Sequence, residues 1–64
     1  MPVDFSELAS MAESMDALAR RVGKMGDAAK AEKKDESATE LYAVERALAG
    51  ATRRLKRLIG AERR

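Results

Sequence analysis

The sequence predicts an all-α protein, a two-helix antiparallel hairpin of the coiled-coil type, on three observations. Two runs of apolar residues each repeat at alternating spacings of three and four. Between them, residues 32–36 read EKKDE and contain no apolar side chain, which is typical of a turn. The composition is rich in Ala, Leu, Glu, Lys and Arg, with one Phe, one Tyr and no Trp, and therefore favours helices.

The first helix is expected at about residues 4–31. In heptad lettering, its a and d positions are Leu8, Met11, Met15, Leu18, Val22, Met25 and Ala29. Asp4 followed by Glu7 is a variant of the capping box, so Asp4 is the expected N-cap. Gly23 and Gly26 are the weak points, and Gly26 offers an alternative early end. We favour continuation, because the segment DAAKAEKK that follows is strongly helical.

The second helix is expected at about residues 37–60, after a turn at about 32–36. Its a and d positions are Leu41, Val44, Leu48, Ala51, Leu55 and Leu58. The sequence Ser-Ala-Thr-Glu at residues 37–40 matches the S-x-x-E capping box, which predicts Ser37 as the N-cap. Gly60 follows the last apolar turn and is the expected C-terminal stop.

The two heptad series can be aligned with each other. In an antiparallel pair, an a position of one helix shares a layer with a d position of the other. The residue numbers in every such pair add to 66, which places the fold-back at Lys33, inside the predicted turn. This register predicts Leu18 and Leu48 as central core residues. The Met residues at 11, 15 and 25 are interpreted as core, with an adaptable binding surface as the alternative.

The apolar stripe is wider than one seam between two helices. The e positions are also small or apolar except for Glu45: Phe5, Ala12, Ala19 and Gly26, then Ala38, Glu45, Thr52 and Ile59. A chain of 64 residues rarely builds a self-sufficient core. We therefore expect the hairpin to complete a four-helix bundle by dimerising or by docking on a larger protein. The expected interface consists of Phe5, Ala12, Ala19, Thr52 and Ile59.

Charge is distributed unevenly along the chain. The formal net charge is +2, but residues 1–19 carry acidic side chains only and residues 46–64 carry seven basic side chains against Glu62. Possible contacts for an anionic partner are Arg46, Arg53, Lys56 and Arg57, a pattern that also occurs on solvated helix faces and is extended by Arg63 and Arg64. No aromatic side chain is interleaved for base stacking, so nucleic-acid binding is the alternative function rather than the first. An amphipathic helix on an anionic membrane is disfavoured because the seam already uses the apolar face.

The residue inventory argues against several classes of protein. Without Cys or His, we expect no disulfide, no metal, no cofactor and no enzymatic activity. No apolar run is long enough to span a bilayer and no signal peptide is recognisable, so a cytoplasmic location is expected. The Ala- and Arg-rich usage suggests a small bacterial protein. The sequence thus predicts a protein–protein interaction module, a self-associating hairpin that serves as adaptor, small subunit or regulator of a larger protein.

Overall fold

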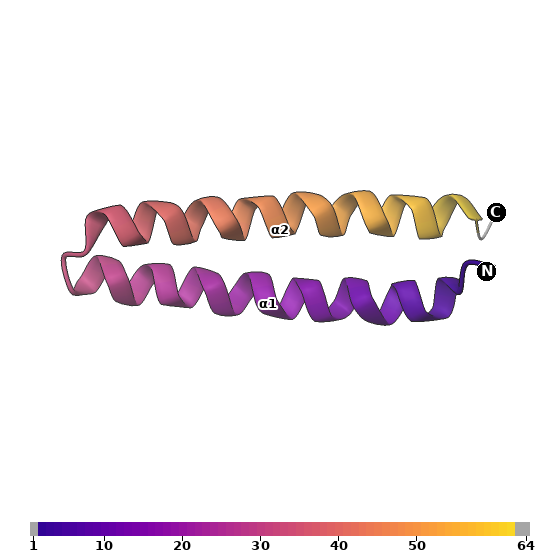
Figure 1. Cartoon of the computed structure of the whole chain (residues 1–64), viewed down its shortest axis with the longest axis horizontal. Helices are drawn as coiled ribbons and strands as arrows, with labels where there is room; N and C mark the ends of the chain where they lie inside the picture. The colour runs from indigo at the N-terminus through magenta and orange to yellow at the C-terminus, as the bar shows by residue number, and fades with distance from the viewer. Residues whose placement is uncertain (1, 63–64) are drawn as a thin grey trace.

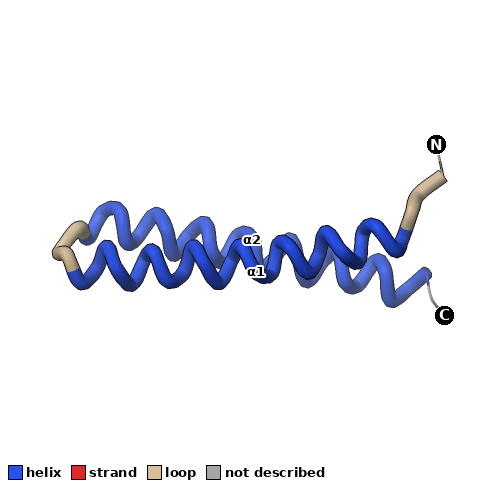
Figure 2. Tube along the Cα trace, turned by 90° about the horizontal axis from the view of Figure 1, so that it is seen from below, coloured by secondary structure: helices blue, strands red, loops and turns tan. Residues whose placement is uncertain are grey.

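The protein is a pair of long helices, seen here in a computed structural model that describes residues 2–62. Helix α1 spans Phe5–Ala31 and helix α2 spans Asp35–Glu62. They lie side by side in opposite directions, with both chain ends at the same end of the molecule (Figure 1). Seen from below, they cross at a shallow angle (Figure 2). The predicted all-α hairpin is confirmed, and the basic residues Arg63 and Arg64 lie outside the described residues.

Helix α1 begins at the predicted cap. The Asp4 carboxylate accepts a hydrogen bond from the Glu7 backbone N–H at 3.0 Å, and the Asp4 carbonyl accepts one from the Leu8 N–H at 3.0 Å. These bonds satisfy N–H groups that the first turn of a helix leaves without partners. The helix then continues without a break through Gly23 and Gly26, so the alternative early end does not occur.

The turn is a Schellman motif that closes α1. Lys33 has φ of 61°, in the left-handed region, and its N–H donates to the Lys30 carbonyl at 3.0 Å. The Lys34 N–H donates to the Ala29 carbonyl at 2.9 Å. These two bonds define the motif, whose left-handed residue is usually glycine because a Cβ atom is unfavourable there. The chain therefore reverses at Lys33, the residue on which the predicted layers are centred.

Helix α2 starts earlier and ends later than predicted. It begins at Asp35, and its first backbone bond runs from the Ala38 N–H to the Lys34 carbonyl at 2.9 Å. Ser37 therefore lies inside the first turn, and its assignment as N-cap is wrong. Asp35 and Glu36 stabilise the start of the helix instead, because negative charges in the first turn interact favourably with the positive end of the helix dipole. Gly60 is not the stop either, since the helix continues to Glu62.

The helices meet along a seam of small residues, which we call the inner seam. Its buried members are Ala12, Ala19, Gly23, Gly26 and Ala29 on α1, and Ala38, Thr52 and Ile59 on α2. Most of them occupy e positions, whereas the predicted seam combined a with d. The change amounts to rotating each helix by roughly 50° about its axis, since successive residues are about 100° apart. The buried hydroxyl of Thr52 donates to the Leu48 carbonyl at 2.8 Å, so it has a partner.

Two glycines of α1 lie against side chains of α2. A Cβ atom added at Gly26 would lie 2.8 Å from Cε1 of Tyr42, and one added at Gly23 would lie 2.2 Å from Oε2 of Glu45. Both distances are below van der Waals contact, so a Cβ atom at Gly26 would displace the Tyr42 ring, and one at Gly23 would turn the flexible Glu45 carboxylate away. The small residues of α1 thus leave space that side chains of α2 fill.

The rotation corrects the predicted core. Leu18, expected at its centre, keeps 46% of its surface exposed, and Leu48 is only half-buried. Met11 and Met25 are exposed as well, so the interpretation of these methionines as core does not hold for the single hairpin. Outside the inner seam, no large apolar side chain of residues 2–62 is buried.

The first prediction concerns the left-handed residue of the turn. Lys33→Gly should stabilise the fold by about 0.5–1 kcal/mol, because the relief of the Cβ strain exceeds the added entropy of the unfolded chain. Thermal unfolding followed by circular dichroism, at matched protein concentration, measures the effect. The control is Glu32→Gly at φ of −86°, where no strain is relieved and a lower melting temperature is expected. Equal effects at the two positions would contradict the turn geometry.

The second prediction tests the close approach along the inner seam. Gly50→Ala should stabilise α2 by about 1 kcal/mol, because Ala is the better helix former. The new Cβ there would meet nothing nearer than Nη2 of Arg53 at 3.8 Å. Gly26→Ala offers the same gain in helix propensity but collides with the Tyr42 ring, so its net effect should be destabilising. Urea unfolding of both variants makes the comparison, and a stabilised Gly26→Ala would mean that the helices lie farther apart.

Candidate interaction surface

The broadest apolar surface of the hairpin follows from the rotation of its helices. We call it the outer apolar face and define it by the d positions of both helices: Met11, Leu18, Met25, Val44, Ala51 and Leu58. Their large members are exposed by 50%, 46%, 58%, 45% and 48% for Met11, Leu18, Met25, Val44 and Leu58. Single exposed apolar residues are ordinary on protein surfaces, but two aligned rows of them along a hairpin form a contiguous patch.

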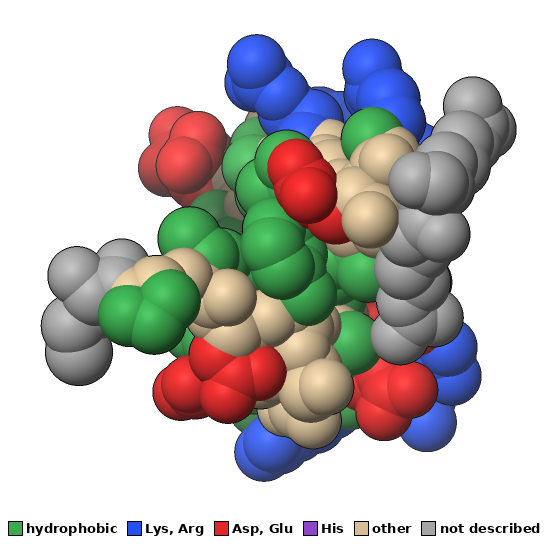
Figure 3. Space-filling view, turned by 90° about the vertical axis from the view of Figure 1, so that its right-hand side faces the viewer, with side chains coloured by type: hydrophobic (Ala, Val, Ile, Leu, Met, Phe, Trp, Pro, Cys, Tyr) green, Lys and Arg blue, Asp and Glu red, His purple; other side chains and the backbone are tan. Residues whose placement is uncertain are grey.

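Both rows belong to the same side of the molecule. In an antiparallel pair, equivalent heptad positions flank the same edge of the seam, so the d rows of α1 and α2 lie next to each other. The a rows lie between them and are half-buried: Leu8, Met15 and Val22, then Leu41, Leu48 and Leu55. An end-on view shows hydrophobic side chains between the helices, with Lys and Arg at the upper edge on α2 and the lower edge on α1 (Figure 3).

The interface residues expected from the sequence lie elsewhere. Ala12, Ala19, Thr52 and Ile59 are buried at 2%, 5%, 3% and 7% exposure inside the single hairpin, and Phe5 is half-buried at the start of α1. Four of the five therefore lie in the intrachain seam, inside one hairpin. The sequence held a signal for this placement: five of the eight e positions carry Ala, Gly or Thr, whereas the d positions of α1 are all large.

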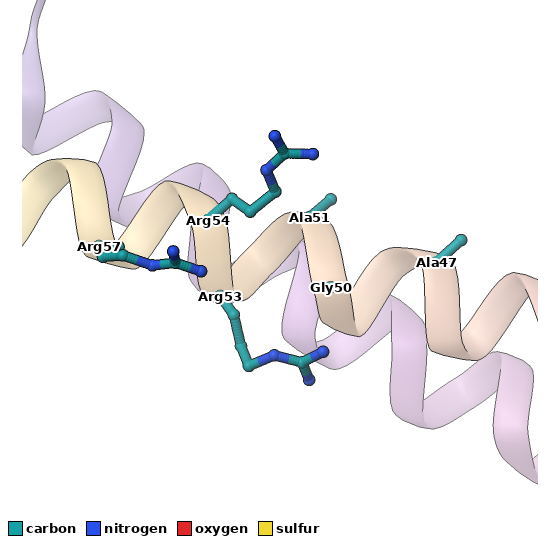
Figure 4. Close-up of a pocket in the computed structure, with 6 residues that line it drawn as sticks. All are labelled: Ala47, Gly50, Ala51, Arg53, Arg54 and Arg57. Carbon is teal, nitrogen blue, oxygen red and sulfur yellow. The ribbon is translucent and has the colours of Figure 1, made fainter.

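The candidate anionic contacts occupy the outside of α2. Arg46, Arg53, Lys56 and Arg57 are all exposed, and none forms an ion pair within the described residues. A shallow depression is lined by Arg53, Arg54 and Arg57 together with Ala47, Gly50 and Ala51. Its arginines diverge, with Arg53 and Arg54 leaving α2 on opposite sides and Arg57 running along the helix between them (Figure 4). The guanidinium groups thus make this side of α2 positively charged, but they do not converge on a single binding point.

The acidic start of α1 and the basic end of α2 lie at the same end of the hairpin, but their charges do not pair directly. Over residues 2–62 the ion pairs are Arg20 with Asp16 on α1 and Lys34 with Glu32 at the turn. Neither joins the two helices. The surface charges of both helices therefore remain available for contacts outside the chain.

One polar contact between the helices stands out in the described part of the chain. The hydroxyl of Tyr42 donates a hydrogen bond to the carboxylate of Asp27, fifteen residues earlier on α1. This bond raises the pKa of Tyr42, because ionisation would remove the donated proton; burial and the negative charges of Asp27 and Glu45 act in the same direction. The contact fastens Tyr42 over Gly26, at the close approach of the helices.

Over residues 2–62 no three acidic side chains are grouped so that they could hold a metal ion. Neither helix has, within its described residues, an apolar segment long enough to cross a membrane. Comparison with protein-family models, curated proteins and solved structures finds no match to this chain. The structure therefore defines a class, the helical hairpin, and its function has to be inferred from its surfaces.

The third prediction uses Tyr42, the only tyrosine of the chain. Alkaline titration followed by phenolate absorbance should give a pKa above 10.0, the ordinary value, and Asp27→Asn should lower it toward that value. Since the folded pKa is raised, the contribution of Tyr42 to stability is fully present below pH 10.0 and is lost as the pH rises through the folded pKa. The control Glu45→Gln should shift the pKa less. A wild-type pKa of 10.0 would rule out the bond to Asp27.

Proposed function

We propose that the protein is a helix-docking interaction module, serving as adaptor, small subunit or regulator, whose contact surface is the outer apolar face. The observation that carries the proposal is the exposure of Met11, Leu18, Met25, Val44 and Leu58 in two parallel rows. Burying such side chains removes apolar surface from water and stabilises the complex by about 25 cal/mol for each Å² buried. Within each row the side chains are seven residues apart, the spacing at which they can pack as knobs into holes on another helix.

The internal packing of the hairpin supports the same proposal. Its inner seam consists of Ala, Gly and Thr, with Ile59 as the one large buried side chain in the described residues. Small side chains remove little apolar area from water, so the seam stabilises the hairpin modestly. The larger Leu, Met and Val residues stabilise the fold fully only when other helices cover them. Binding and folding are therefore expected to be coupled.

The fourth prediction tests which surface makes contacts in the cell. A photo-crosslinking amino acid at Leu18 should link the hairpin to a second polypeptide, either another copy or a larger protein, because Leu18 lies at the centre of the outer apolar face. The same amino acid at Arg20, an exposed residue about 160° around α1 from Leu18, should not. Crosslinked products are separated by gel electrophoresis and identified by mass spectrometry. Equal crosslinking at both positions, or none at Leu18, would refute the proposal.

The second candidate function is association with nucleic acid through Arg46, Arg53, Lys56 and Arg57. Its support is that these side chains are exposed and free of ion pairs in the described chain. Phosphate contacts weaken steeply with salt, whereas apolar docking does not. Binding to generic DNA or RNA that falls with salt and is lost in Arg53→Gln/Arg57→Gln, with helix content unchanged, would favour this alternative.

A further inference from the structure

We infer that the outer apolar face is covered by a second copy of this chain, docked face to face with its turn at the opposite end, as a two-fold symmetric four-helix bundle. This inference rests on the proposed function and identifies the partner. It follows from the area of the face, the sizes of its side chains and the charges along its edges.

The broad side of the hairpin is large enough for a stable dimer interface. The hairpin measures 47 × 19 × 14 Å, and Figure 1 views it down the shortest dimension. The whole broad side, charged edges included, is thus about 900 Å² in outline, which is room for the roughly 800 Å² that each partner contributes to a standard interface. A single docked helix would cover about half of this width, since helices pack 8–10 Å apart. A second hairpin covers both d rows at once.

Side-chain size selects the direction of the second copy. Along the hairpin, the layers Met15/Ala51 and Val22/Val44 contain the smaller side chains, and the layers between and beside them contain Leu and Met. With the turns at the same end, each layer would face its own duplicate. Four valines would then meet in one layer and two alanines in another, and both layers would be underfilled. Native interiors are packed to near-crystalline density, so such layers are unfavourable.

With the turns at opposite ends, small layers face large ones. Full overlap of the two faces puts the two-fold axis between the layers Met15/Ala51 and Leu18/Leu48. Ala51 then shares its level with Leu48 of the other copy, and the valine layer shares its level with Met11 and Leu55. Large side chains fill the space that small ones leave, as in interdigitated cores. Homodimers of this kind are closed and self-complementary, which a two-fold axis requires.

The edges of the face carry opposite charges on each helix. Glu7 and Arg21 on α1, and Glu40 and Arg54 on α2, occupy the g positions that border the d rows. All four are exposed, and none has an ion-pair partner within the described chain. Antiparallel docking of like helices brings the acidic half of each edge over the basic half of its counterpart. The edges therefore attract a second copy rather than repel it.

The experiment combines mass measurement with a label distance, using the fact that the chain has no cysteine. Analytical ultracentrifugation of the wild type over a dilution series should show a dimer. Leu18→Glu should raise its dissociation constant by at least about 100-fold, because an unpaired charge would be buried. Ala17→Glu, the same charge on the outside of α1, should leave the dimer unchanged.

A nitroxide on Glu32→Cys, at the turn, reports the direction of docking by pulsed electron spin resonance. Turns at opposite ends predict a label separation of about 45 Å, from a helical rise of 1.5 Å per residue. Turns at the same end predict roughly 15–25 Å, from helix spacings and the label arms. A nitroxide on Ala17→Cys, near the two-fold axis, should give a short distance in either case and serves as the control.

The outcomes separate this inference from the function on which it rests. A wild type that stays monomeric at every dilution overturns the second copy, and the crosslinks from Leu18 then decide the proposed function on their own. A dimer with a short Glu32 label distance overturns the opposed direction only. A dimer that Leu18→Glu leaves intact places the interface elsewhere and overturns both. If Leu18→Glu loses its helices, the label distances still decide, because they are measured with the outer apolar face unaltered.

Discussion

The packing of small residues between α1 and α2 determines the rest of the structure. Gly23 and Gly26 leave room for the Glu45 carboxylate and the Tyr42 ring where a Cβ atom would collide. The alanines at 12, 19 and 38 continue this contact along the seam, where each is at most 5% exposed. Ile59 is the one large side chain buried in this seam among the described residues, and the Leu and Met side chains lie beside it, half-buried or exposed. The same packing that joins the helices thereby creates the apolar surface that we assign to binding.

This arrangement divides the apolar residues by size. Small side chains lie between the two helices, where their dispersion contacts are weak singly and strong together. Large side chains contribute most of the apolar surface area, and burying that area would be favourable. In the single hairpin much of it stays exposed. The hairpin therefore buries its small apolar residues and leaves many of its large ones partly exposed. Its stability and its binding then draw on the same residues, so a change such as Leu18→Ala acts on both.

The polar contacts contribute more to geometry than to stability. Tyr42 and Asp27 join α1 to α2 beside Gly26, and this bond favours one relative rotation of the helices over others. The Schellman turn at Lys33 fixes the end of α1 and so determines which layers face each other. The basic side chains of α2 point away from both contacts. They can therefore be changed without disturbing the seam, which allows folding and binding to be tested separately.

The sequence alone determined the helices, the cap at Asp4, the position of the turn and the apolar stripe, because these depend on local spacing and local hydrogen bonds. It did not determine where α2 begins, since Asp35 and Glu36 belong to the helix that follows the turn at Lys33. Nor could it choose among the a, d and e rows, because all three are apolar or small and a heptad pattern permits more than one rotation. Only the packing of α1 against α2 decided that e positions lie inside and d positions outside. Packing between the helices depends on the sizes of side chains on both helices together, and neither helix carries that information by itself.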